Sequence, residues 1–83
     1  MNITTADKTL DRMKNNPRDW HIDDLLAVAV RHGIEVRNNV GSHHVFSAVG
    51  ITESLCVPAH RPVKPVYIKR FTAMIDAIKE RTP

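Results

Sequence analysis

Cysteine and glycine are scarce in this sequence, and it contains no long apolar run. A single cysteine, Cys56, cannot form an internal disulfide or build a zinc site alone. Three glycines are too few for a glycine-rich phosphate loop. The longest apolar run, Leu25 to Val30, is far shorter than the ~20 residues that cross a bilayer. The first residues also lack the basic and apolar regions of a secretory signal. We therefore expect a cytoplasmic protein without a metal site or a membrane partner.

The chain has room for one modest core. Its 83 residues fit a single domain, which at this size buries roughly 60–65% of the surface that the unfolded chain exposes. That excludes a large enzyme with separate cofactor and substrate domains, and we expect no cofactor. Twelve Lys and Arg against nine Asp and Glu give a net charge of +3, a basic bias that is compatible with RNA.

Helical periodicity dominates the first 33 residues. Residues 4–15 predict a weak helix with two strong apolar positions, and Pro17 lies in a polar connector. Residues 22–32 predict a packed helix with His21 at its N-cap and Gly33 at its C-terminus. Its apolar stripe has helical spacing and comprises Ile22, Leu25, Leu26, Ala29 and Val30.

After Gly33 the hydrophobic period changes to that of strands. Three short strands are expected over 34–37, around 45–49 and over 53–57, with turns at 38–41 and at Gly50. A stiff loop over 58–65 then carries three prolines and leads into a last helix that begins at Pro65 or Val66. The order α–α–β–β–β–α predicts an α+β fold with a three-stranded antiparallel sheet.

Two adjacent histidines are the most unusual feature of the predicted second strand. Phe46 should face the helices, and alternation then puts His44 on the same face and His43 on the open face. Because they point to opposite faces, the pair cannot easily chelate one metal ion. Histidine is the side chain best suited to proton transfer near neutral pH, so His43 is a candidate catalytic group. The alternative is that both are ordinary polar strand residues.

Two further sets of residues have competing interpretations. Cys56 lies between Leu55 and Val57, which favours a small buried hydrophobe over a reactive thiolate. Basic residues gather at the proline loop and the start of the last helix, where side chains and free N–H groups together can bind phosphates. The alternative is a solvated polar face. These basic residues are Arg61, Lys64, Lys69 and Arg70.

Taken together, the motifs resemble a known family. The segments 41–46 (Gly-Ser-His-His-Val-Phe) and 57–62 (Val-Pro-Ala-His-Arg-Pro) follow an amphipathic helix that ends at a glycine. A basic, proline-led helix comes after them. This pattern is similar to the HicA family, the small mRNA interferases of type II toxin–antitoxin modules, over about residues 21–79. The proline loop resembles that of a longer subgroup, and residues 1–20 form an extension that many members lack.

The resemblance implies a fold similar to the double-stranded-RNA-binding domain, with two helices on one face of the sheet. Residues 1–20 would be an N-terminal helical extension, and residues 21–83 the RNA-cleaving domain of one compact unit. The family cleaves mRNA without a metal in translating cells, uses one catalytic histidine and is neutralised by a HicB-type antitoxin. Its motif selects His43, with His44 as the alternative.

The implied mechanism is that of a general base. His43 would take the proton of an RNA 2′-hydroxyl, and the cut would leave a 2′,3′-cyclic phosphate and a 5′-hydroxyl. His60 and Tyr67 are candidates for the general acid. Residues expected to contact RNA are Gly41, Ser42, Lys64, Lys69 and Arg70, with Arg37 as a weaker candidate. Two alternatives are a non-catalytic RNA-binding module of the same fold and an interaction subunit that serves only a partner protein.

Overall fold

The computed structural model of this chain describes residues 5–38 and 41–81 and has an α+β fold. Two helices, α1 (Thr5–Asn15) and α2 (Ile22–Arg31), precede the strands β1 (Glu35–Asn38), β2 (His43–Ser47) and β3 (Leu55–Pro58). The long helix α3 (Pro65–Arg81) follows them. This is the predicted element order. Residues 1–4, 39–40 and 82–83, which include the centre of the expected 38–41 turn, lie outside the described residues.

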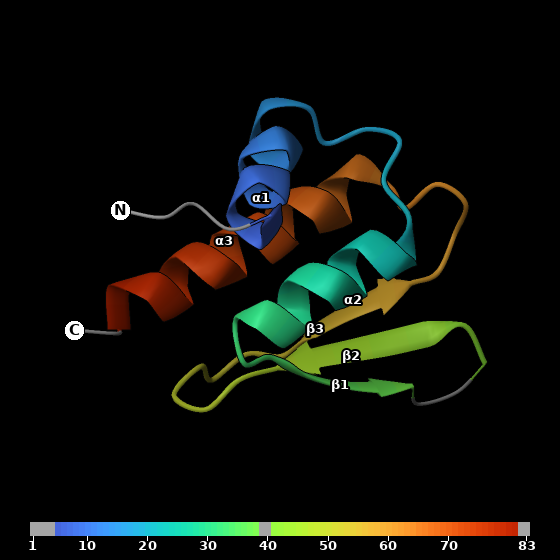
Figure 1. Ribbon diagram of the computed structural model, residues 1–83. Helices are drawn as coiled ribbons and strands as arrows, with labels where there is room; N and C mark the ends of the chain where they lie inside the picture. Colours follow the sequence, from blue (N-terminus) through green and yellow to red (C-terminus); the bar gives the residue numbers. More distant parts are fainter. Residues whose placement is uncertain (1–4, 39–40, 82–83) are drawn as a thin grey trace.

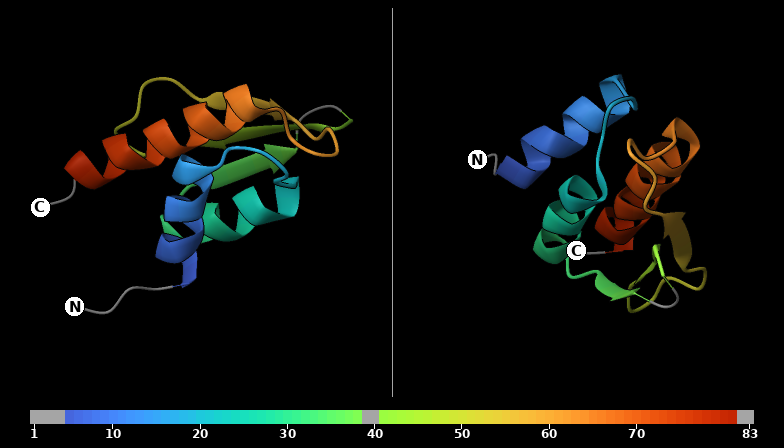
Figure 2. Two further views of the ribbon diagram at one scale, coloured as in Figure 1. Left: turned by 90° about the horizontal axis from the view of Figure 1, so that it is seen from above. Right: turned by 90° about the vertical axis from the view of Figure 1, so that its right-hand side faces the viewer.

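The strands form an antiparallel meander in the order β1-β2-β3. Helices α2 and α3 cover one face of this sheet, and α1 packs on the far side of those two helices (Figures 1 and 2). The molecule therefore has three layers, the middle one made by α2 and α3. The opposite face of the sheet has no described helix on it.

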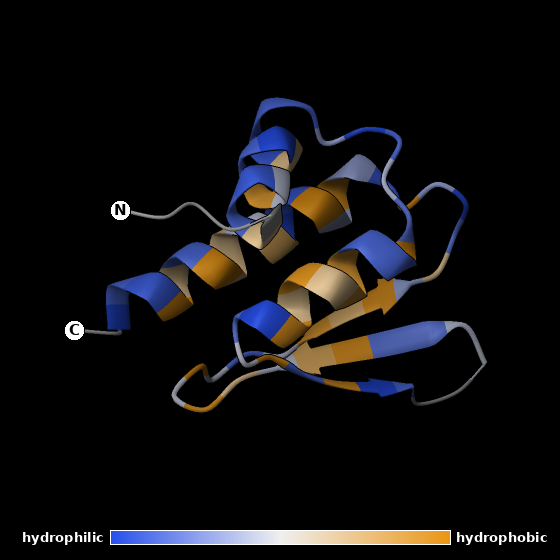
Figure 3. Cartoon of the chain, in the orientation of Figure 1, coloured by the Kyte–Doolittle hydropathy of each residue, from blue (hydrophilic) through white to orange (hydrophobic). Residues whose placement is uncertain are grey.

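One core fills the space between these layers. Phe46 of β2 and Phe71 of α3 are fully buried, and their rings meet edge to face with centroids 5.4 Å apart. Figure 3 shows hydrophobic residues in all three layers, whereas β2 is hydrophilic in its first half. The fully buried side chains of the other elements include Leu10, Met13, Leu25, Val57, Ile68 and Ile75.

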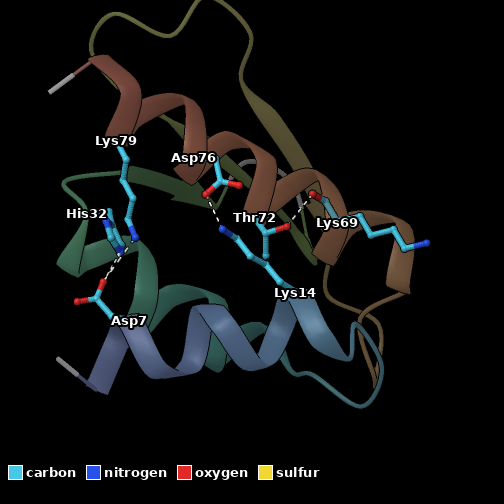
Figure 4. Close-up of polar contacts among 7 residues, drawn as sticks. All are labelled: Asp7, Lys14, His32, Lys69, Thr72, Asp76 and Lys79. Carbon is cyan, nitrogen blue, oxygen red and sulfur yellow. Dashed lines mark hydrogen bonds and ion pairs between the residues drawn. The ribbon is translucent and has the colours of Figure 1, made fainter. Parts of the chain in front are cut away.

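Helix α1 contributes more to the core than its weak pattern indicates. Its two strong apolar residues, Leu10 and Met13, are 0% and 1% exposed. Lys14 also pairs with Asp76 of α3 at 2.6 Å, and Lys79 of α3 lies 3.7 Å from Asp7 (Figure 4). Helix α1 therefore packs against the core.

Two burial predictions are wrong. Val30 is 77% exposed, and Val28 is buried in its place, because Val30 is turned about 140° around the helix from the buried Leu25. Cys56 is exposed rather than buried. Only one face of the sheet is covered, so three consecutive apolar residues of β3 cannot all point inward; Val57 does and Cys56 does not.

The strands occur where the period changes, but their bounds differ from the prediction. The first strand begins and ends one residue later, and the third runs over 55–58 instead of 53–57. The second begins earlier, at His43, and ends at Ser47. Consequently both histidines of the pair lie inside β2. Pairing with the neighbouring strands, which a single strand's pattern does not reveal, determines these bounds.

Candidate active site

The topology brings several of the predicted site residues, His43, His60 and Lys64 among them, to one end of the molecule. There β1 ends, β2 begins, β3 ends, and both α2 and α3 start (Figure 1). We call this the turn end. Four of the five histidines belong to segments at the turn end, namely His21, His43, His44 and His60, whereas His32 follows the last turn of α2 at the opposite end.

Strand alternation separates the two adjacent histidines as predicted. His43 is exposed and pairs across the sheet with Pro58 of β3. His44 is half-buried, pairs with the buried Val57, and points to the helix-covered face with Phe46. Its Nδ1 atom is buried without a hydrogen-bond partner among the described residues. Of the two, His43 is the imidazole that a large substrate can reach.

Backbone and amide contacts hold the segment just before His43. Gly41 has φ +58°, a conformation that strongly favours glycine. With its nitrogen turned toward the carbonyls, the Asn38 amide donates to Gly41 O at 2.8 Å and to His43 O at 3.1 Å. The Ala59 N–H donates to Ser42 O at 2.8 Å. Asn38 and Ala59 are thus supporting residues that the sequence reasoning missed, although an asparagine before a turn glycine is a usable signal.

The basic residues are exposed but do not share one surface. Lys64 precedes α3 at the turn end, in the same exposed loop as Arg61. Lys69 and Arg70 are consecutive in α3, so their side chains diverge by about 100°. Figure 4 shows Lys69 extending away from the ion pairs of α1 and α3. Within residues 5–38 and 41–81, none of these four cations has a carboxylate at ion-pair distance.

Arg37 is placed differently from the other candidates. It lies on the open face of β1, and its Nε is 3.3 Å from Oε1 of Glu35. Both side chains are largely exposed, which makes this a weak pair that a phosphate can replace.

The two candidates for the general acid also differ. His60 is exposed, two residues after the end of β3, and its backbone N–H donates to the Pro58 carbonyl oxygen at 2.9 Å. Tyr67 lies in the first turn of α3 and packs partly buried against the core.

At the opposite end, His32 occupies a polar junction of three helices. Its Nε2 is 4.0 Å from Asp7 of α1, and Lys79 of α3 approaches the same carboxylate (Figure 4). Burial lowers the pKa of His32, Lys79 and Arg31 lower it further, and Asp7 opposes them. This histidine is a structural group of the helix junction, remote from His43.

Among the described residues, His43 lines neither of two surface hollows. A hollow of about 800 Å³ lies between α3 and the loop from β2 to β3, and Arg70 is the one predicted site residue that lines it. In the part of the chain that the structure describes, no group of three or more His, Cys, Asp or Glu side chains is placed to hold a metal ion. No helix there is long and apolar enough to cross a membrane.

Comparison with known proteins returns no relative. No family model matches the chain, and no curated protein and no solved structure matches it.

Proposed function

We propose that this chain is a metal-independent endoribonuclease of the HicA type, the mRNA-cleaving toxin of a type II toxin–antitoxin module. Its three-stranded sheet with α2 and α3 on one face is compatible with a fold like that of the double-stranded-RNA-binding domain, to which α1 adds a layer. The proposal rests on the motif resemblance together with one observation. His43 is exposed at the start of β2, while its neighbour His44 turns toward the helices.

In this reaction His43 acts as the general base. Its imidazole takes the proton of an RNA 2′-hydroxyl, and the 2′-oxygen attacks the adjacent phosphorus. The products are a 2′,3′-cyclic phosphate and a free 5′-hydroxyl. Positioned proton transfer of this kind contributes roughly 10²- to 10⁴-fold to the rate. Because the attacking group is the 2′-hydroxyl, DNA is not a substrate.

Lys64 and Arg61 supply positive charge at the same end of the molecule, and Gly41 and Ser42 provide exposed backbone next to His43. Lys69 and Arg70 extend the basic surface along two sides of α3. A HicB-type antitoxin would cover His43 and present acidic residues to these cations, since opposite charge steers and aligns such partners.

The decisive test is RNA cleavage in the presence of a metal chelator. We expect the unsubstituted protein to cleave and His43→Ala to lose roughly 10²- to 10⁴-fold in rate. His44→Ala should retain cleavage for the fraction of molecules that fold, since that side chain faces the helices. His21→Ala is the matched control, because His21 is also an exposed histidine at the turn end.

The alternative function, a non-catalytic RNA-binding module, is favoured by the same unpaired cations, which need no histidine. It predicts salt-sensitive RNA binding without cleavage and an unchanged affinity for His43→Ala. An interaction subunit would bind no RNA even at low salt. Cleavage that is lost in His44→Ala but not in His43→Ala would reverse the assignment of the two histidines.

A further inference from the structure

A second exposed histidine lies beside His43 at the turn end. The backbone pairing of β2 and β3 continues past the end of β3, because the Ala59 N–H donates to Ser42 O at 2.8 Å. His60 directly follows Ala59, and His43 directly follows Ser42. His43 itself pairs with Pro58 across the sheet. The backbone carbonyl of Pro58 accepts a hydrogen bond from the backbone N–H of His60 at 2.9 Å. The start of β2 and the loop after β3 thus lie side by side at the turn end, and each carries an exposed histidine.

The spacing suits a pair of groups that act on one phosphodiester. Neighbouring strands lie about 4.7–4.9 Å apart, and diagonal cross-strand neighbours about 7–8 Å apart. A scissile phosphate has the attacking oxygen on one side and the leaving oxygen on the other. A base and an acid must therefore stand on opposite sides of the phosphorus, within hydrogen-bond reach of these oxygens. One imidazole on β2 and one just after β3 can span such a group.

We propose that His60 is the general acid of the reaction, an inference that rests on the proposed ribonuclease function. His43 removes the 2′-hydroxyl proton as the 2′-oxygen forms its bond to phosphorus. The bond from phosphorus to the 5′-oxygen breaks, and the protonated His60 gives its N–H proton to that oxygen. His43 ends the step protonated and His60 neutral, and exchange with water restores both.

Exposure and chemistry favour His60 over Tyr67. Tyr67 is partly buried and packs against the core from α3, whereas His60 is exposed in the loop. Histidine is also the side chain whose ordinary titration falls in the neutral range, so it can donate a proton and recover it at each turnover. Lys64 remains a phosphate contact, since an ammonium group at neutral pH serves better as a fixed charge than as a proton donor.

The test compares two leaving groups in one RNA oligonucleotide. One substrate has the natural 5′-oxygen at a single cleavable linkage, and the other has sulfur at that position. A thiolate leaves without a proton, so the sulfur linkage does not need the acid. On the natural linkage we expect His60→Ala to lose roughly 10²- to 10⁴-fold in rate. On the sulfur linkage it should cleave nearly as fast as the unsubstituted chain. His43→Ala should be slow on both.

Controls separate this role from binding and from folding. Tyr67→Phe should cleave both substrates like the unsubstituted chain, and RNA affinity and thermal stability should be unchanged in His60→Ala. The basic limb of the pH–rate profile on the natural linkage should disappear in His60→Ala. If His60→Ala loses the same factor in rate on both linkages, or loses no rate on either, His60 is not the general acid. The proposed ribonuclease function would stand in both cases. If the unsubstituted chain cleaves neither linkage, the ribonuclease function fails and this role fails with it.

Discussion

The two ends of this small molecule differ in whether their charged side chains form ion pairs. At the helix junction, Asp7, Lys79 and His32 approach one another from three helices, and Lys14 meets Asp76. At the turn end, Arg61 and Lys64 are exposed with no carboxylate at ion-pair distance among the described residues. Arg61 and Lys64 are therefore available to an external anion, although Asp23 and Asp24 in the first turn of α2 lie at the same end.

The comparison also separates stability from function. The Lys14–Asp76 pair is 38% and 48% exposed at its two side chains, and such pairs contribute only about 0.2–1 kcal/mol. The fully buried Leu10 and Met13 contribute far more to the attachment of α1. We expect changes at the junction to alter stability, and changes at the turn end to alter RNA binding and cleavage.

The largest effect on stability is expected for Leu10→Ala. Truncating this fully buried side chain should lower the free energy of unfolding by about 2–5 kcal/mol, through lost burial and the cavity left behind. Chemical denaturation measures it, and Val49→Ala is the matched control because Val49 is fully exposed. Cleavage per folded molecule should stay unchanged. Reduced cleavage by fully folded Leu10→Ala would mean that the two ends are coupled.

A smaller effect, confined to binding, is expected for Lys64→Ala. Loss of one phosphate contact should weaken RNA binding and make the slope of log affinity against log salt less negative by about one. Lys8→Ala is the matched control, because Lys8 is an exposed lysine of α1, outside the turn end. Filter binding over a range of salt concentrations provides the measurement. Equal slopes for the two variants would remove Lys64 from the interface.

The smallest effect is expected at His32, through pH. Burial and Lys79 lower the pKa of His32 in the folded state below its ordinary value of 6.5. The folded state therefore binds a proton less readily than the unfolded chain does. The contribution of His32 to stability is present above pH 6.5 and is lost as the pH falls through the lowered pKa. Thermal unfolding between about pH 7.5 and about pH 5 should show this decline, and His32→Gln should show a shallower one. If stability declines equally with falling pH in the unsubstituted chain and in His32→Gln, the decline comes from the carboxylates and not from His32.

Periodicity predicted the elements because each buries one face. The spacing of Leu25 and Ala29, and of Phe71 and Ile75, is enough to locate α2 and α3, and both pairs are buried. Val30 and Cys56 show the limit of this reasoning. Apolar character predicts burial only where a neighbouring element covers that face, and neither residue has such a neighbour. For α1, the two strong apolar positions of a weak pattern are enough, because Leu10 and Met13 are 0% and 1% exposed.

The candidate site was partly predictable for the same reason. Alternation alone assigned His43 to the open face once Phe46 was taken as core, and the structure has that arrangement. What the sequence did not reveal was the neighbourhood created by pairing across strands. The hydrogen bond from Ala59 to Ser42 brings the backbone of His60 to the end of the sheet where β2 begins with His43, although 16 residues separate the two histidines in the chain. Likewise, Lys69 and Arg70 are adjacent in sequence, but their side chains point in different directions because consecutive residues of a helix are about 100° apart around its axis.

The contact between α1 and α3 has a consequence for how the chain is made. Lys14 and Asp76 are 62 positions apart, so α1 packs against a helix that is synthesised well after it. During translation Leu10 and Met13 emerge early and stay without their full set of partners until α3 is complete. The sheet, whose strands follow one another directly, can assemble before that moment. The three layers therefore close only after α3 has left the ribosome, and a chain that stops short of α3 leaves part of the apolar face of α1 exposed to proteases and chaperones.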